Sequence, residues 1–263
     1  MTSVPERGDI DRMPRGGPDA SWLDRRLQTD RSEYLDRDDV DDRVKRRIVR
    51  SLERIGRLSN NHEKFALLAI NQVAEVPDPR ILELGAGHGG LSRKLLELHP
   101  RAKVTVTDLD RASVADLVAG DLGHDPRATI GTMDATAIDA PDGHFDLVVF
   151  ALGFHHLAPP LASRVFTEGT RVATKLMIID LPRLPSVLHI LQLGVFLPFA
   201  AFHPFAHDGL ISSLRAYSPS AMRALARHAD PTIDVRIRTR AWAPQVTIAS
   251  REIYLAGEGA SYS

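Results

Sequence analysis

The feature that most constrains this chain is a regular alternation of strand and helix patterns after residue 79. Apolar runs predict strands at 80–84, 103–108, 128–130, 145–150 and 175–180, and helical patterns lie between them, as at 89–98 and 114–118. The fourth and fifth runs are mostly apolar, as expected of strands buried on both faces. Such alternation predicts an α/β fold, a mainly parallel sheet with helices on both faces.

Two further strand patterns follow near the end of the chain, at 233–239 and 245–255. The few residues between them leave no room for a helix, so the two strands are expected to pair as an antiparallel hairpin at the sheet edge. Together the patterns predict a Rossmann-like, seven-stranded, mostly parallel sheet with an antiparallel C-terminal hairpin.

The amino-acid composition excludes several classes of function. The 263 residues are 43% hydrophobic and 25% charged, which suits one domain with an appendage. The absence of cysteine excludes disulfides, thiolate metal sites and cysteine nucleophiles. The net charge of −1 gives no basis for a nucleic-acid partner.

The chain divides into three parts by composition. Residues 1–20 carry no signal-peptide pattern and are expected to form a disordered tail, which makes the cytoplasm the expected location. Residues 21–77 predict charged amphipathic helices, serving as a lid or as dimer contacts in a homodimer. Residues 78–263 predict the main domain, with an insert at about 182–217.

The first predicted strand leads into a glycine-rich loop. Gly85, Gly87 and Gly90 fit the G-x-G-x-x-G pattern of dinucleotide-binding folds, with Asp108 where a ribose-binding acid is expected. The same loop, through Glu83 and the glycines at 85, 87 and 89, equally resembles the E-x-G-x-G-x-G loop of class I methyltransferases that use S-adenosylmethionine. The loop alone therefore leaves a nicotinamide cofactor and S-adenosylmethionine open.

Three other features favour the second cofactor. The third predicted strand is followed by Met133-Asp134-Ala135. The fourth is followed by Ala151-Leu152-Gly153-Phe154-His155-His156-Leu157, and the last two strands form the predicted hairpin. No tyrosine has a lysine four residues later, as a short-chain dehydrogenase requires. As an ordered set over about residues 60–255, these motifs resemble class I S-adenosylmethionine-dependent methyltransferases. The similarity is to the small-molecule branch that acts in ubiquinone, menaquinone and polyketide metabolism, including secondary metabolism.

The resemblance implies S-adenosylmethionine as cofactor, S-adenosylhomocysteine as product and no metal. It implies that the loop backbone holds the carboxypropyl end, Asp108 the ribose hydroxyls, Leu109 the adenine face and Asp134 the adenine amine. The full set of expected cofactor-binding residues is Glu83, Gly85, Ala86, Gly87, Gly89, Asp108, Leu109, Met133, Asp134, Ala135 and Ala151.

His155 and His156 follow the fourth strand, where doubly wound sheets place their ligands. Either one could act as a general base on an acceptor hydroxyl. Successive residues of an extended chain point in opposite directions, so only one is expected to face the methyl group. The alternative is that the loop histidine only packs near the cofactor.

The insert contains no charged residue from 184 to 207. That length could cross a bilayer, but its prolines, its polar residues and the need to return to the sheet argue against integral insertion. We predict an apolar cap over the acceptor, with a dimer contact or membrane-surface contact as alternatives. The residues expected at the acceptor pocket are Phe199, Phe202, His203, Arg215 and Tyr217. For the last two, the alternative is a helix surface and a turn.

The sequence therefore predicts an S-adenosylmethionine-dependent methyltransferase for a small aromatic or lipid-like acceptor. A phenol, quinol or polyketide-like molecule methylated on oxygen is the leading hypothesis, and carbon methylation of a quinol ring is the alternative. From other classes, the alternatives are a non-catalytic cofactor-binding regulatory protein and an NAD(P)-dependent oxidoreductase.

Overall fold

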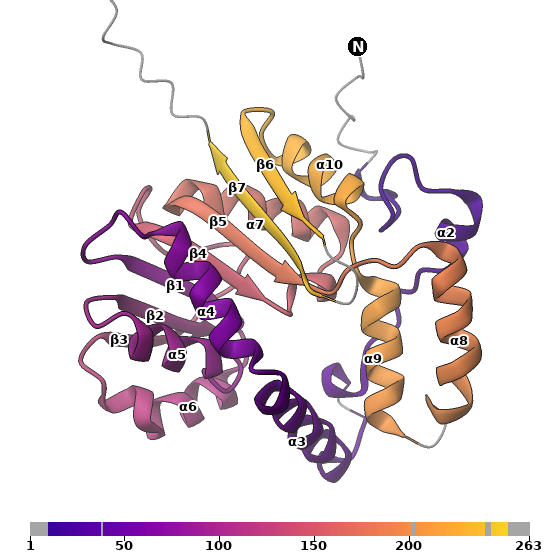
Figure 1. The fold of residues 1–263 in the computed structure, drawn as a ribbon, viewed down its shortest axis with the longest axis horizontal. Coiled ribbons are helices and arrows are strands. Elements are labelled where there is room, and N and C mark those ends of the chain that lie inside the picture. Colours follow the sequence, from indigo (N-terminus) through magenta and orange to yellow (C-terminus); the bar gives the residue numbers. More distant parts are fainter. Residues whose placement is uncertain (1–9, 38, 201–202, 240–242, 252–263) are drawn as a thin grey trace, which may run out of the picture.

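The computed structural model describes residues 10–37, 39–200, 203–239 and 243–251. Its centre is a seven-stranded sheet in the order β3-β2-β1-β4-β5-β7-β6 (Figure 1). The strands are β1 (Arg80–Leu84), β2 (Lys103–Asp108), β3 (Ala128–Thr132), β4 (Phe145–Ala151), β5 (Ala173–Asp180), β6 (Ile233–Arg238) and β7 (Gln245–Arg251).

The direction of the strands matches the predicted fold. The first five strands run parallel, while β7 pairs antiparallel with both β5 and β6. The α/β sheet with a reversed C-terminal strand is thereby confirmed. Parallel pairing brings the carboxyl ends of β1, β2, β3 and β4 to one sheet edge, where ligands of such sheets bind.

Helices cover the two faces of the sheet. On one face lie α4 (Asn61–Gln72) and α5 (Gly90–Leu98), with α6 (Arg111–Ala119) beyond them, and on the other lie α7 (Pro159–Val172) and α10 (Pro219–Ala229). Strand β4 shows why its sequence is mostly apolar. Val148 and Phe150 belong to one buried cluster, and Leu147 and Val149 belong to the other.

The N-terminal segment, residues 10–37, packs on the domain instead of hanging free. It contains α2 (Trp22–Arg26) and the 3₁₀ turn η1 (Tyr34–Asp36), and Ile10 and Met13 join the core cluster on the α7 face. Residues 10–20 had been expected to be disordered from their composition, and this was wrong. Residues 1–9 lie outside the described part of the chain.

Arg15 explains why this polar segment docks. Its side chain is 4% exposed, and Nη1 donates hydrogen bonds to the carbonyl oxygens of His155 at 2.8 Å and Arg215 at 2.6 Å. The guanidinium also lies 4.8 Å from the ring centroid of Tyr217. These partners are 140 and 200 residues away in sequence, so no local pattern reveals them.

The remaining helices surround the site edge. Helix α3 (Asp42–Ser59) precedes α4, and the predicted insert forms α8 (Ser186–Ala200) and α9 (Pro204–Arg215), which pack on each other. Within the described ranges, no helix is both long enough and apolar enough to cross a bilayer.

We predict that Arg15→Ala lowers the free energy of unfolding by about 2–4 kcal/mol, because two buried carbonyls lose a charged donor. The measurement is denaturant unfolding. The exposed Arg12 of the same segment supplies the control, and Arg12→Ala should change stability by less than about 0.5 kcal/mol. Equal effects of the two substitutions would contradict the docked position of the segment.

Candidate active site

The glycine-rich loop between β1 and α5 has the backbone that its sequence predicts. Gly85, Gly87 and Gly89 have φ values of +62°, +52° and +71°, in the left-handed region that favours glycine. A Cβ at Gly89 would lie 2.5 Å from Leu122 Cδ1, whereas one at Gly87 would meet no atom within 4 Å. The loop therefore packs tightly at its end and leaves open space beside Gly87.

Glu83 lies buried below this loop. Burial raises the pKa of its carboxyl to about 7, although a hydrogen bond from Ser92 opposes the shift. Thr107 Oγ1 donates to the Glu83 carbonyl oxygen at 2.7 Å. These contacts fix the end of β1 against β2 and α5.

Asp108 at the end of β2 holds the loop from the other side. Its Oδ2 accepts the Gly87 N–H at 2.8 Å and its Oδ1 accepts the Asp110 N–H at 2.9 Å. Each carboxylate oxygen has a further lone pair for a ligand hydroxyl. The next residue, Leu109, is 67% exposed, as a side chain that covers a flat ligand would be before binding. Asp110 caps α6 by accepting from Ala112 and Ser113 N–H groups, as a capping residue does.

The ends of β3 and β4 complete the edge. Asp134 is exposed, and its Oδ1 accepts from Thr136, which leaves Oδ2 available. Met133 N–H donates to the Asp108 carbonyl oxygen at 3.1 Å, so the two predicted cofactor segments are joined directly. Leu152, after Ala151, has a φ of +57°, a strained conformation of the kind found at ligand sites.

A cavity of about 610 Å³ opens between α3 and this edge. It is lined by Lys45, Arg46, Val49, Arg50, His88, Asp110 and Ala112. Helix α3 therefore borders the cofactor loop, which is compatible with the lid expected of the N-terminal helices.

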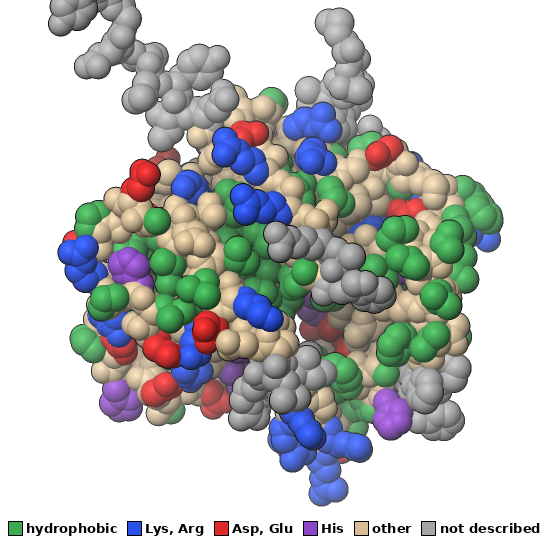
Figure 2. Space-filling view, viewed as in Figure 1, with side chains coloured by type: hydrophobic (Ala, Val, Ile, Leu, Met, Phe, Trp, Pro, Cys, Tyr) green, Lys and Arg blue, Asp and Glu red, His purple; other side chains and the backbone are tan. Residues whose placement is uncertain are grey.

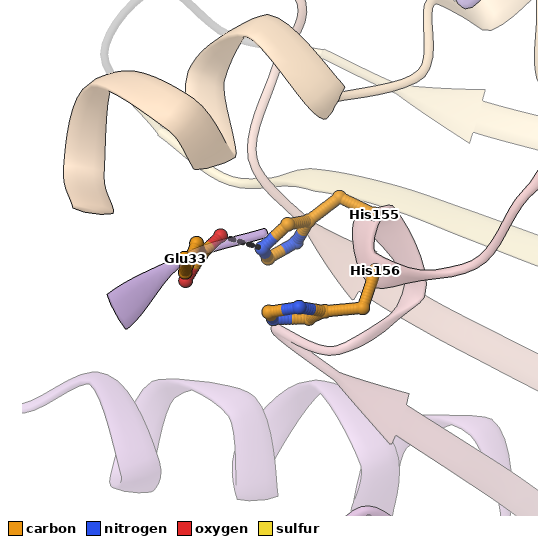
Figure 3. A group of neighbouring side chains, drawn as sticks. All are labelled: Glu33, His155 and His156. Atoms are coloured by element: carbon orange, nitrogen blue, oxygen red, sulfur yellow. Dashed lines mark ion pairs between the residues drawn. The ribbon is translucent and has the colours of Figure 1, made fainter. Parts of the chain in front are cut away.

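His155 is 3% exposed and lies between two carboxylates. Its Nδ1 is 2.7 Å from Asp180 Oδ1, and its Nε2 is 3.4 Å from Glu33 Oε1 (Figure 3). Burial alone would lower the pKa of this imidazole, but Asp180 and Glu33 outweigh it and raise the pKa to about 9. His155 is therefore an imidazolium at neutral pH.

The same pairing acts on Glu33. Burial would raise the pKa of this carboxyl, but His155, His156 and Ser212 lower it below its usual value. Ser212 Oγ, on α9, donates to Glu33 Oε1 at 2.6 Å. Glu33 is thus held as a carboxylate.

His156 is placed differently from its neighbour. Its side chain is 31% exposed, and its Nδ1–H donates to Asp36 Oδ2 at 2.9 Å. The two histidines belong to the 3₁₀ turn η3 (Phe154–His156), and their ring centroids are 4.3 Å apart. The expectation of an extended chain with opposite side chains was wrong, because both residues lie in a 3₁₀ turn and their rings lie side by side (Figure 3).

Glu33, His155 and His156 offer three ligand atoms within 4.8 Å of one another, a spacing that a metal ion could bridge. A metal ligand must supply a lone pair, and the His155 imidazolium has none. Two carboxylates around one protonated ring leave a net charge of −1 on these three groups. A metal ion at this place would have to displace the proton on His155 Nε2.

The predicted acceptor residues do not gather in one pocket. Tyr217 is buried, and its hydroxyl donates to the Leu157 carbonyl oxygen at 2.8 Å, so its expected place against the acceptor was wrong. Arg215 is also buried, and Nη2 donates to the His156 carbonyl oxygen at 2.5 Å. It supports the histidine turn from behind. His203 lies exposed before α9, and the side chains of Phe199 and Phe202 lie outside the described part of the structure.

Four residues of the site were missed by sequence reasoning. Asp180 is the last residue of β5, at the sheet edge where the other site residues lie. Its place at the end of a predicted parallel strand could therefore have identified it as a site residue. Glu33 and Asp36 reach the site only because segment 10–37 docks, and Leu152 gave no signal at all.

Comparison with known proteins agrees with this arrangement. Residues 81–175 match the family model of a methyltransferase domain. A malonyl-[acyl-carrier protein] O-methyltransferase of Geobacter sulfurreducens is 36% identical over 100 residues, which are 38% of this chain and 36% of that protein. A mitochondrial ribosomal RNA small subunit methyltransferase of Arabidopsis thaliana is 36% identical over 104 residues, 38% of this chain and 26% of that protein.

Among solved structures, the plantazolicin methyltransferase BamL, in complex with a triazolic desmethylPZN analog and S-adenosylhomocysteine, has a TM-score of 0.62 at 11% identity. The similarity covers 83% of this chain and 92% of that one, and it concerns the fold. The matched stretch spans about a third or less of the curated relatives, whose names differ in acceptor. The Rossmann-like fold predicted from the sequence is thereby confirmed, and the match of residues 81–175 to a methyltransferase domain agrees with the predicted family.

The ion pair of His155 predicts a pH dependence of stability. The folded pKa of about 9 exceeds the ordinary value of about 6.5. The stabilisation is therefore complete below pH 6.5 and is lost as pH rises through 9, a change of about 3 kcal/mol. The free energy of unfolding of the wild type should fall over this range relative to His155→Gln. The control is His203→Gln, because His203 is exposed, and its curve of unfolding free energy against pH should follow that of the wild type. A constant difference between wild type and His155→Gln would contradict the assigned protonation.

Proposed function

We propose that this chain is a class I, S-adenosylmethionine-dependent methyltransferase that methylates a small apolar or aromatic acceptor on oxygen, since residues 81–175 match the family model of a methyltransferase domain. The observation that carries the proposal is the arrangement at one sheet edge. An open glycine cradle, a bidentate carboxylate at Asp108 and a histidine turn all face the same region.

The residues present fit the cofactor. The open space beside Gly87 accepts the carboxypropyl chain against the loop backbone, and Asp108 accepts hydrogen bonds from the ribose hydroxyls. The free Oδ2 of Asp134 suits the adenine amine, and exposed Leu109 covers the ring. When bound, the cofactor supplies a methyl group activated by a sulfonium charge.

We propose different roles for the two histidines. His155 is already protonated, so it serves to fix the turn and cannot accept a proton at neutral pH. Asp36 binds Nδ1–H of His156 and thereby directs the lone pair of Nε2 away from the carboxylate. We assign Nε2 of His156 as the base that takes the acceptor hydroxyl proton, while Arg215 and Asp36 position the ring.

The acceptor class follows from the resemblance of the sequence motifs to small-molecule methyltransferases, which act on molecules of the phenol, quinol or polyketide kind. The O-methyltransferase name of one relative agrees with oxygen as the methylated atom. Carbon methylation of a quinol ring would use the same proton acceptor and is the alternative.

Calorimetric titration with S-adenosylhomocysteine tests the cofactor site. The wild type should bind it with micromolar affinity and should not bind NADH. Asp108→Asn should weaken binding at least tenfold, since a charged hydrogen bond contributes about 1.5–3 kcal/mol. Asp116→Asn, an exposed carboxylate on α6, is the matched control and should bind as the wild type does. Binding of NADH in place of S-adenosylhomocysteine would overturn the proposal.

A second measurement tests the base. With an acceptor found by screening phenols and quinols for methyl transfer, His156→Gln should lower kcat by about 10²-fold and leave S-adenosylhomocysteine affinity unchanged. An unchanged kcat in His156→Gln would show that positioning alone drives the transfer.

A further inference from the structure

Helix α8 has its polar side chains on the inside. His189 is fully buried, and its Nε2 lies 3.2 Å from Ser213 Oγ on α9. The same Ser213 hydroxyl donates to Gln192 Oε1 at 2.9 Å. His189 and Gln192 are three positions apart, on one helix face, and that face packs against α9.

The opposite face of α8 is apolar and exposed. At about 100° per residue, the exposed apolar positions other than Phe196 span about half of the helix circumference, and Phe196 lies on the side of His189 and Gln192. The exposed large side chains are Val187, Leu188, Ile190, Leu191, Val195, Phe196 and Leu197, with exposed fractions of 41–73%. Figure 2 shows hydrophobic side chains gathered at the edge of the molecule where α8 lies.

This arrangement reverses the usual amphipathic helix of a water-soluble domain, which buries its apolar stripe. Single exposed apolar residues are ordinary, but a continuous apolar face marks a contact surface. The helix contains no charged residue. Because His189 Nε2 and Gln192 Oε1 both contact the Ser213 hydroxyl of α9, rotation of α8 to bury the apolar face would break these two contacts.

The neighbouring helix α2 adds residues that favour a lipid surface. Trp22 is 68% exposed, and the Arg26 guanidinium lies 4.8 Å from its ring centroid. Arg183, just before α8, binds α2 through Asp24 Oδ1 at 3.0 Å and the Leu27 carbonyl. Tryptophan and arginine beside an apolar helix are the composition found at membrane–water boundaries.

More positive charge lies on α3, which packs against α9 from another side. Its exposed basic residues are Arg43, Arg46, Arg47, Arg50 and Arg54. Such charges attract the protein to anionic headgroups over about a Debye length. Charge complementarity therefore favours an anionic lipid surface over a second copy of this chain, whose own patch carries the same positive charges.

We propose that the outer face of α8, together with Trp22, docks this protein on the surface of an anionic phospholipid membrane. Arg25 and Arg26 contact the headgroups, and α8 lies in the plane of the interface without crossing it. The proposal rests on side-chain placement in α2, α8 and α9, and it holds whichever acceptor the site takes.

Vesicle flotation tests this docking with the full chain. The wild type should float with phosphatidylcholine vesicles that contain phosphatidylglycerol, and much less with phosphatidylcholine alone. The double substitution of Val187→Glu and Leu191→Glu, one turn apart on the outer face, should lower the bound fraction at least tenfold. Arg25→Glu with Arg26→Glu should reduce binding and remove most of its salt dependence.

The matched control is Val118→Glu, which places the same charge on an exposed apolar position of α6. It should float as the wild type does. All variants should keep wild-type affinity for S-adenosylhomocysteine, which separates loss of docking from loss of folding.

Two results would overturn the proposal. One is no flotation of the wild type with either vesicle, and the other is equal loss in Val118→Glu. Light scattering that shows a dimer dispersed by the α8 substitutions, without vesicle binding, would assign the face to a second copy instead.

Discussion

His155 lies buried between Asp180 at the end of β5 and Glu33 in the N-terminal segment, and the geometry of the site depends on this triple contact. The three residues come from distant parts of the sequence, so the contact fixes the sheet edge, the turn η3 and segment 10–37 together. Its anionic surroundings keep the imidazole charged although burial opposes the charge. The His155 N–H also donates to Asp180, so backbone and ring are held by one carboxylate.

The two adjacent histidines are therefore proposed to have different chemical roles. The proton on His155 is tied into the structure, whereas His156 faces a partly open region with one nitrogen engaged by Asp36. Arg15 and Arg215 bind the carbonyl oxygens of the two residues from behind. A turn anchored in this way can present one imidazole at a fixed position, which is the main requirement of a methyl-transfer site that works by alignment.

Local patterns in the sequence predicted the parts of this molecule that depend on local physics. The glycine loop, the strands β1 to β5 and the reversed β7 follow from periodicity, glycine spacing and connection length. Segment 10–20 was predicted wrongly because its composition is polar, while its docking depends on carbonyl partners far along the chain. Asp36 could not be found for the same reason, and Tyr217 was misplaced because nothing local shows that its hydroxyl is used by Leu157.

Helix α9 connects the two regions of interest. Ser212 binds Glu33 on the site side, and Ser213 binds His189 and Gln192 of α8 on the other. The uncharged run that predicted an apolar insert was a correct observation, but hydropathy alone cannot tell which face of a helix is turned inward. Only the hydrogen bonds of α9 reveal that α8 directs its apolar side to the outside.

The central claim, that segment 10–37 completes the site by placing Glu33 on His155, is tested most directly by an NMR titration of the His155 ring. The wild type should titrate near pH 9, and Glu33→Gln should lower that pKa, because one of the two carboxylates that stabilise the imidazolium is removed. Ser32→Gln, an exposed neighbour, should leave the titration unchanged. A wild-type pKa near 6.5 that is insensitive to Glu33→Gln would contradict the account.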